Sequence, residues 1–277
     1  MIYHLTTKAE WEAAQKQGTY LPKGFPTEGF IHCSDHYQLK RVANAFYPST
    51  PDLICLKIDT DKLDAPVVYE NLEGGKMLFP HIYGGLPVAA VLGTFEILFD
   101  ADGKRVLPPE ETFPGAPVFT HLPLGLPGKL YRSPTPGSRM FDPEDAVFPH
   151  FIEAEIDVVV VLSPEDETQR NMGGDLFKRY AEAGIAVIHA PTEDFSAPAK
   201  GHWDETIAEV IALLEAGKNI VVHCHAGLGR TGMFVACLAQ DVLGLSADES
   251  VGWVRQYIPW AIDTYLQKQF VREYKQL

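Results

Sequence analysis

The 277-residue sequence has no apolar run long enough to cross a membrane. Its first residues, Met1 to His4, also lack the basic and apolar segments of a secretory signal. These absences argue against a transmembrane or secreted protein, so we expect a cytoplasmic one. No internal repeat is visible, which argues against a solenoid or a propeller. With 46% hydrophobic residues, the chain is expected to be globular.

Cysteine and positive charge are both scarce. The four cysteines, at positions 33, 55, 224 and 237, form no paired motif, which argues against a disulfide framework and indicates a reducing compartment. The 23 Lys and Arg residues are outnumbered by 37 Asp and Glu, and most of the net charge of −14 arises after residue 99. A broad acidic surface disfavours nucleic acid and anionic membranes as partners.

One segment, 222–232, carries most of the functional information. It reads Val-His-Cys-His-Ala-Gly-Leu-Gly-Arg-Thr-Gly and separates a strand-like apolar run from a helix-like one. A glycine-bearing loop at a helix start directs backbone amides to one point and forms an anion site, which also favours a thiolate. Cys224 is therefore a candidate nucleophile, and Arg230 offers a planar fork to phosphate oxygens. The alternative, a glycine-rich turn with a buried cysteine, requires neither Arg230 nor Thr231.

The segment resembles the signature of the cysteine-dependent protein-tyrosine and dual-specificity phosphatases, which is His-Cys, five residues, Arg, and Ser or Thr. The resemblance implies hydrolysis of phosphomonoesters through a phosphocysteine at Cys224, without a metal or a cofactor. Arg230 would bind the phosphate, and the hydroxyl of Thr231 would assist departure of the sulfur. The remaining loop residues are candidates for substrate binding: His223, His225, Ala226, Gly227, Leu228 and Gly229.

Two further segments resemble parts of the same family. Its general acid lies on a mobile loop, four residues before a proline, and Asp194 and Pro198 have that spacing. Glu193 is the alternative acid. Gln267 corresponds by position to a glutamine that places the hydrolytic water in relatives, although Ile-Pro-Trp stands where the family often has Arg-Pro-Gly. A glutamine on a helix surface is the alternative.

The apolar pattern divides the chain into two domains, 1–99 and 118–277. Acids and prolines with little periodicity predict a linker over 100–117. In the second domain strands alternate with helices, which predicts an α/β fold with a mostly parallel sheet covered by helices on both faces. The strands are expected at 129–133, 157–162, 185–190 and 219–222, and the helices at 143–155, 165–183 and 203–216. The loop of Cys224 then follows the carboxyl end of a strand, where ligands bind in such sheets.

The first domain is predicted to be a small α+β domain. A capping box at Thr7 and a cap at Ser34 predict two helices, the first ending at Gly18 and the second at Phe46. Strands are expected at 2–5, 30–33, 53–58, 67–69 and 88–97. A further capping box, at Ser246, predicts a helix in the second domain.

The first domain resembles a small bacterial domain family of unknown function that is distantly similar to ADP-ribosyltransferases. The resemblance implies a site for NAD or ADP-ribose, with ribose held by His4 and Thr6. Glu70 would take the acidic role, and His32 and Ser34 stand where a tyrosine is expected. The candidate residues are His4, Thr6, His32, Ser34, Glu70 and His81. The alternatives are structural histidines, or a zinc site using His4, His32, Cys33, His36 or His81.

The leading functional prediction is a phosphatase acting on phosphotyrosine or on mixed phosphoproteins. One alternative is a phosphatase for a small nucleotide or ADP-ribosyl phosphate supplied by the first domain. Another is a module that binds phosphorylated ligands without catalysis. The variable loop positions His225, Ala226 and Leu228 lack the lysines of phosphoinositide-specific relatives, which disfavours an inositol lipid.

Overall fold

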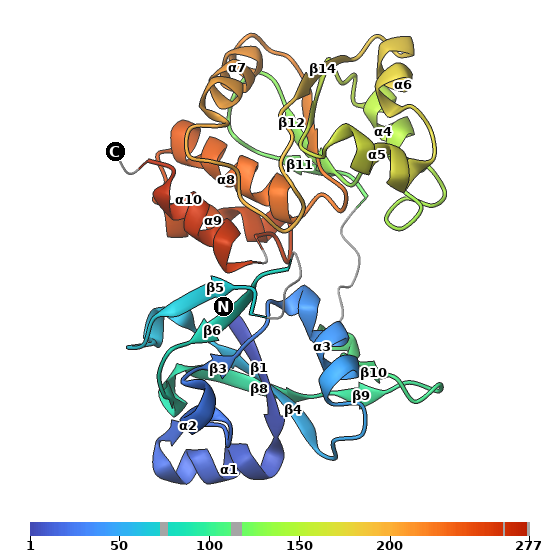
Figure 1. Ribbon diagram of the computed structural model, residues 1–277. Helices are drawn as coiled ribbons and strands as arrows, with labels where there is room; N and C mark the ends of the chain where they lie inside the picture. Colours follow the sequence, from blue (N-terminus) through green and yellow to red (C-terminus); the bar gives the residue numbers. More distant parts are fainter. Residues whose placement is uncertain (73–76, 112–117, 263, 276–277) are drawn as a thin grey trace. The chain divides into compact units, whose positions relative to one another are not determined.

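The computed structural model describes residues 1–72, 77–111, 118–262 and 264–275. The chain forms two compact units, Met1–Pro114 and Gly115–Leu277 (Figure 1). Within the described ranges, no helix has the length and apolar character needed to span a bilayer.

The second unit is built on a five-stranded sheet in the order β11-β12-β15-β13-β14. The central strand β15 (Ile220–His223) runs parallel to β12 (Leu130–Ser133) and β13 (Val158–Val161), and β14 (Ala186–His189) continues the parallel set. Only β11 (Thr120–Leu122), at the edge of the described sheet, is antiparallel. In the register, the last residues of β12 and β13 lie beside His223, so three carboxyl ends meet next to Cys224.

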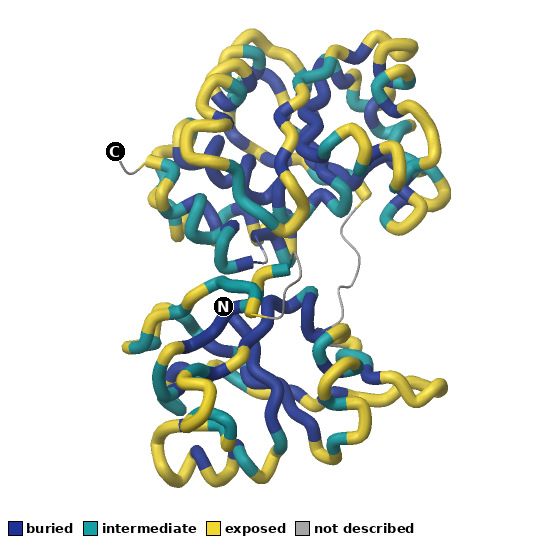
Figure 2. Tube along the Cα trace, viewed as in Figure 1, coloured by how far each residue is buried: buried dark blue, intermediate teal, exposed yellow. Residues whose placement is uncertain are grey.

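Helices cover both faces of this sheet, as predicted (Figure 1). The alternating valines of β13 divide between two cores: Val158 and Val160 pack with helices α7 to α10, and Val159 and Val161 pack with α4 and α6. The central strands β13 and β15 are consequently buried along their whole length, whereas β14 at the sheet edge is partly exposed (Figure 2). The helices are α4 (Val147–Glu153), α5 (Glu165–Met172), α6 (Leu176–Glu182), α7 (Asp204–Glu215), α8 (Gly229–Leu243), α9 (Ala247–Tyr257) and α10 (Tyr265–Glu273).

The single helix predicted over 165–183 is wrong, because two helices occupy this range. Gly173, with φ of +78°, ends α5 in the left-handed conformation, and the carboxylate of Asp175 caps the start of α6. The capping box predicted at Ser246 is confirmed: Ser246 accepts a hydrogen bond from the amide of Glu249, whose side chain accepts one from the amide of Ser246.

The first unit mixes small antiparallel sheets with short helices. β1 (Ile2–Thr7), β4 (Leu53–Ile58) and β8 (Val91–Glu96) form one sheet, and α3 (Leu39–Phe46) packs on one of its faces. Two further sheets have the orders β3-β6-β5 and β2-β7. The other elements are α1 (Lys8–Gln17), α2 (Phe25–Glu28), β2 (Thr19–Tyr20), β3 (Ile31–His32), β5 (Val67–Glu70), β6 (Phe79–Ile82), β7 (Leu86–Pro87), η1 (His36–Gln38), η2 (Thr60–Lys62) and η3 (Val88–Ala90). The first three residues of the strand predicted at 88–97 form η3 instead.

Residues 100–111 belong to the first unit and are not the linker that was predicted. Strand β9 (Leu98–Phe99) pairs antiparallel with β10 (Arg105–Val106), and η4 (Pro109–Glu111) follows. The buried guanidinium of Arg105 fixes this hairpin by donating to carbonyls of Tyr47, Thr50 and Ile97. Residues 112–117 lie outside the described residues.

The predicted cap at Ser34 is also wrong. Asp35 is the N-cap residue of η1, and the helical segment continues as α3. Ser34 instead exchanges two backbone hydrogen bonds with Tyr3 of β1. Strand pairing therefore fixes Ser34, and the capping role falls to the next residue.

Candidate active site

The loop after β15 is shaped by its close approach to the end of β12. Cys224 follows the strand, is 2% exposed, and precedes four residues that lead into α8. Gly227 has φ of +70°, and a Cβ atom there would lie 2.1 Å from the carbonyl oxygen of Ser133. Only glycine fits this position without displacing the backbone.

The carbonyl groups of loop residues 224–227 all accept hydrogen bonds from the segment that follows β12. Thr135 donates to the first two carbonyls through Oγ1 (2.7 Å) and its amide (3.0 Å). Arg132 donates to the last two through Nη2 (3.5 Å) and Nε (3.1 Å). Across a trans peptide, the carbonyl and the next amide point in opposite directions. The amides of 225–228 therefore turn away from this segment, and within the described ranges they have no backbone acceptor. Loop amides left without a backbone acceptor at a helix start can form an anion site.

His223 supports the loop from inside the core. Its Nε2 lies 2.8 Å from the hydroxyl of Tyr180, and its Nδ1 lies 3.3 Å from the carbonyl oxygen of Cys224. Burial lowers the pKa of His223 to about 4, although the hydrogen bond to that carbonyl opposes the shift. The imidazole is therefore neutral near pH 7 and holds the loop as a hydrogen-bonding group.

Arg230, in the first turn of α8, is the centre of a charged cluster. Glu167 of α5 accepts from both terminal nitrogens, at 2.8 Å for Nη1 and 2.7 Å for Nη2. Nη2 also lies 3.0 Å from Oδ1 of Asp194, and Nη1 donates to the carbonyl of Thr192 at 2.9 Å. Nε of Arg230 is buried and has no hydrogen-bond partner among the described residues. The Nε–Nη2 edge, which in arginine presents two parallel N–H groups, is therefore the edge that a ligand oxygen could bind, in competition with Asp194 at Nη2.

The segment that carries Asp194 connects β14 to α7. The amide of Thr192 donates to the carbonyl of Leu162 at 3.0 Å, and the buried indole of Trp203 donates to Ala190 at 3.3 Å. These bonds fix the two ends, so Asp194 lies at Arg230. Phe195 follows with φ of +58°, a conformation that is unusual for a bulky residue and is concentrated at functional sites. The alternative acid Glu193 is exposed, and its backbone carbonyl accepts from Ser196.

The cluster shifts the pKa values of its members. Burial alone would lower the pKa of Arg230, but hydrogen-bonded Glu167 and the charges of Cys224 and Asp194 raise it overall. Partial burial raises the pKa of Asp194, the charge of Glu167 adds to this, and Arg230 opposes it. A carboxyl with a raised pKa is better able to carry a proton at neutral pH, as a general acid must. Burial lowers the pKa of His225.

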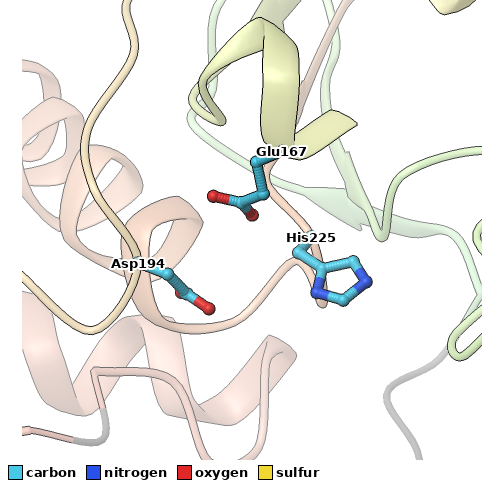
Figure 3. A group of neighbouring side chains, drawn as sticks. All are labelled: Glu167, Asp194 and His225. Atoms are coloured by element: carbon cyan, nitrogen blue, oxygen red, sulfur yellow. The ribbon is translucent and has the colours of Figure 1, made fainter. Parts of the chain in front are cut away.

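Glu167, Asp194 and His225 point toward one another from three separate segments (Figure 3). Their potential ligand atoms lie within 4.8 Å of one another. Glu167 and Asp194 already form ion pairs with Arg230, so these carboxylates are the counter-ions of an arginine. A divalent cation at this point would have to displace the guanidinium, which argues against these residues as a metal centre.

Two predicted residues occupy specific places beside the loop. Thr231 is buried, and among the described residues its hydroxyl has no hydrogen-bond partner, so the expected bond to sulfur is not formed in this structure. Gln267 is 2% exposed, and a Cβ atom at Gly229 would lie 2.6 Å from its Nε2. The alternative of a helix-surface glutamine is therefore wrong, and Gln267 packs against the start of α8.

Sequence reasoning missed Glu167, Arg132 and Thr135. Glu167 lies far along the chain from Arg230 and belongs to no spaced motif. Arg132 and Thr135, however, surround the end of a predicted parallel strand, where ligand-binding residues collect. That position was the signal that could have identified them.

In the first unit, the predicted residues separate into two groups. His4 and Thr6 form a buried chain in which His4 Nε2 contacts the Tyr20 hydroxyl at 2.9 Å, and Tyr20 donates to Thr6 Oγ1 at 2.9 Å. Thr6 in turn donates to Glu10 at 3.0 Å. Tyr20 is thus the tyrosine beside His4 and Thr6, a residue that sequence reasoning did not select. Burial lowers the pKa of His4 to about 4.

The other group lies on β3, β5 and β6. His32 Nδ1 is 3.1 Å from His81 Nε2, and His81 Nδ1 is 3.4 Å from a carboxylate oxygen of Glu70, which also accepts from Tyr83. A cavity of about 150 Å³, mainly apolar, is lined by His32, Ser34 and His81 among other residues. Within the described residues, the histidines and Cys33 of the zinc alternative do not gather into a metal-binding group.

Two family patterns match separate parts of the chain. Residues 5–94 match a family described as "Protein of unknown function (DUF952)". Residues 138–241 match one described as "Polymorphic toxin system, DSP-PTPase phosphatase", and this range contains Cys224, Arg230, Asp194 and Glu167. The second unit is therefore similar to phosphatases of the tyrosine and dual-specificity type. Phosphatases of this type need no cofactor.

Curated relatives and a solved structure are also similar to the second unit. Protein tyrosine phosphatase domain-containing protein 1 of Danio rerio is 35% identical over 97 residues, which cover 35% of this chain and 14% of the relative. Human dual specificity protein phosphatase CDC14A is 28% identical over 145 residues, covering 50% of this chain and 22% of the relative. The chain thus spans less than a quarter of each relative.

The fold is shared with the crystal structure of kinase associated phosphatase in which the catalytic-site cysteine is replaced by serine. The TM-score is 0.52 at 20% sequence identity, and the match covers 57% of this chain and 93% of that one.

Proposed function

We propose that the phosphatase domain hydrolyses phosphomonoesters through a phosphocysteine at Cys224. One observation carries this proposal: Arg132 and Thr135 hold the carbonyls of loop residues 224–227, which leaves the loop amides to bind an anion beside Cys224 and Arg230. The amides would bind phosphate oxygens, and the Nε–Nη2 edge of Arg230 would bind two of them side-on while Glu167 holds the opposite end of the guanidinium. All four cysteines are free thiols, which supports the cytoplasm as the compartment.

In the first step, the thiolate of Cys224 attacks phosphorus, a P–S bond forms, and the bond from phosphorus to the leaving oxygen breaks. That oxygen takes a proton from Asp194, whose raised pKa suits this role. Because Nη2 of Arg230 has Asp194 as one of its partners, a phosphate oxygen bound side-on competes with that carboxylate. Substrate binding would therefore turn Asp194 from the arginine toward the leaving group.

In the second step, water attacks the phosphocysteine and gives its proton to the Asp194 carboxylate. A P–O bond forms, the P–S bond breaks, and Cys224 returns to the thiolate with release of inorganic phosphate. Gln267 beside the loop would position this water, and the buried hydroxyl of Thr231 would stabilise the departing sulfur.

We propose protein phosphotyrosine or mixed phosphoprotein as substrate. Phosphate release from matched phosphotyrosyl, phosphoseryl and phosphothreonyl peptides tests this, with Cys224→Ser as control. Release that disappears in the variant supports the proposal, and the ratio of the three rates assigns the specificity. Turnover only of phosphorylated ADP-ribose or nucleotides would replace the substrate class with a small molecule. Phosphate binding without turnover of any of these compounds would mark a binding module.

For the DUF952 domain we propose NAD or ADP-ribose as ligand, supported by the cavity beside His32, Ser34 and His81. Titration of the full chain with each compound tests this by calorimetry and by melting temperature. The absence of both binding heat and a change in melting temperature would rule the ligand out. A response abolished by His81→Ala, but retained by Cys224→Ser, would assign it to the first unit.

A further inference from the structure

The anion site depends on a segment that the mechanism above does not use. Residues 132–135, here called the loop brace, leave β12 and pass behind the loop of Cys224. Through Arg132 and Thr135, the brace hydrogen-bonds each carbonyl of 224–227. Buried carbonyls require such partners. If one of these peptides flipped, its oxygen would point at the bound phosphate and repel it.

Burial of the Arg132 guanidinium costs folding free energy. It is 0% exposed, and burial lowers its pKa to about 10, against which the charge of Cys224 acts in the opposite direction. A buried cation is destabilising unless charge and hydrogen bonding compensate it. Near pH 7 Arg132 is still protonated, so a positive charge lies behind the loop close enough to interact with the sulfur.

We propose that Arg132 and Thr135 are positioning residues for the phosphatase reaction: they hold the four carbonyls outward, so that the loop amides stay directed at phosphate. This inference rests on the proposed function. It differs from a purely structural role, in which the brace would stabilise the domain and leave the anion affinity of folded protein unchanged.

The test compares Arg132→Met, Thr135→Val and Thr135→Ser in the full chain. Thr135→Val removes the hydroxyl at nearly constant shape, and Thr135→Ser restores it. Arg272→Met is the matched control, since Arg272 lies on α10 in an ion pair with Asp248. Two assays are used. The first gives KM and kcat for p-nitrophenyl phosphate, and the second gives the concentration of orthovanadate or inorganic phosphate that protects Cys224 from iodoacetamide.

We expect Arg132→Met to raise KM and the protecting concentration about 10- to 100-fold, and Thr135→Val about 10-fold, by the usual value of hydrogen bonds that hold a charged ligand site. Thr135→Ser should recover affinity to within about 3-fold of the wild type. Arg272→Met should behave as the wild type.

Unchanged anion protection in folded Arg132→Met and Thr135→Val, with only a lower melting temperature, would overturn the inference. If Arg132→Met does not fold, the Thr135→Val and Thr135→Ser pair decides alone. A wild-type chain that neither releases phosphate nor is protected by anions would instead refute the proposed function. The two failures are therefore distinguishable.

Discussion

Arg230 determines the geometry of the site at the scale of single residues. Its guanidinium can hold a carboxylate at one end and a phosphate along its side, because its five N–H groups are fixed in a plane. Glu167 takes the end, and Asp194 contacts the nitrogen shared by both edges. In the proposed mechanism, substrate binding, orientation of Arg230 and release of Asp194 would therefore be coupled through one side chain.

The first residue-scale prediction concerns Glu167. Glu167→Gln should lower kcat/KM about 10- to 100-fold, since a bidentate charged hydrogen bond that orients Arg230 is lost. The charge of Glu167 raises the pKa of Asp194, so its removal lowers that pKa. Asp194 must be protonated in the first step, and the alkaline limb of the kcat profile should therefore move to lower pH.

Glu165→Gln is the matched control, since Glu165 lies in the same first turn of α5 but bonds Gln169 on the helix surface. Its pH profile should match the wild type. An equal effect of both substitutions would show that Glu167 acts through general charge and not by orienting Arg230.

The second residue-scale prediction separates the two candidate acids. Asp194→Ala should lower kcat about 100- to 10,000-fold for aryl or alkyl phosphates with poor leaving groups, and less for good ones. Glu193→Ala should have little effect, because Asp194 is the residue that forms the ion pair with Arg230. A loss for Asp194→Ala that does not depend on leaving-group pKa would remove Asp194 as the acid.

Spacing along the chain was sufficient to nominate Cys224, Arg230 and Asp194, because the chemistry fixes their types within two short segments. It was insufficient for Glu167 and Arg132. A carboxylate beside an arginine, or a donor behind a loop, can come from any segment that folding brings near. Only the strand order, with β12 and β13 on either side of β15, supplies that proximity.

At the scale of elements, the active site arises where three parallel strands end and one helix begins. The loop must turn within a few residues while it passes the carbonyl of Ser133, and this constraint falls on Gly227. Gly244, which ends α8 with φ of +67°, has the same left-handed backbone but nothing within 4 Å of a Cβ atom. A substitution at Gly244 therefore measures only the free-energy cost of a left-handed backbone. A substitution at Gly227 adds the steric clash of a Cβ atom with Ser133.

Gly244→Ala should destabilise the chain by about 1–2 kcal/mol, the usual cost of a left-handed alanine. Gly227→Ala should add displacement of the loop from Ser133 and abolish anion protection of Cys224. Urea unfolding and alkylation protection measure the two effects. Anion affinity retained in Gly227→Ala would contradict the described loop conformation.

Local sequence pattern was sufficient to predict the cap at Ser246 and the strand β13, which is a run of valines. Two of the element-level predictions that failed did so for a reason that local pattern does not contain. From the sequence, Gly173 is compatible with a position inside a helix or directly after one. In the structure its left-handed conformation ends α5. The acid- and proline-rich stretch after residue 99 looked like a linker, yet Arg105 anchors it through contacts with Tyr47 and Thr50.

At the scale of the whole molecule, each unit contains a histidine whose pKa burial lowers to about 4: His4 in the first and His223 in the second. In the unfolded chain these groups titrate near 6.5. Between pH 6.5 and 4 the unfolded chain therefore binds more protons, and stability falls as the pH falls. The upper limit is about 3 kcal/mol per histidine.

Urea unfolding at pH 7 and pH 5 measures this loss. His4→Gln and His223→Gln should each reduce the difference between the two pH values, whereas His202→Gln, at an exposed histidine, should leave it unchanged. An unchanged difference in either buried variant would show that the corresponding imidazole does not stay neutral in the folded state.

The most direct measurement of the central claim is rapid acid quench of the wild-type chain during turnover, followed by mass spectrometry of its peptides. The account predicts one phosphoryl group on the peptide containing Cys224, which accumulates in Asp194→Ala with a good leaving group and is absent from Cys224→Ser. Steady phosphate release with no phosphoryl group on this peptide, or with the group on a histidine, would contradict it.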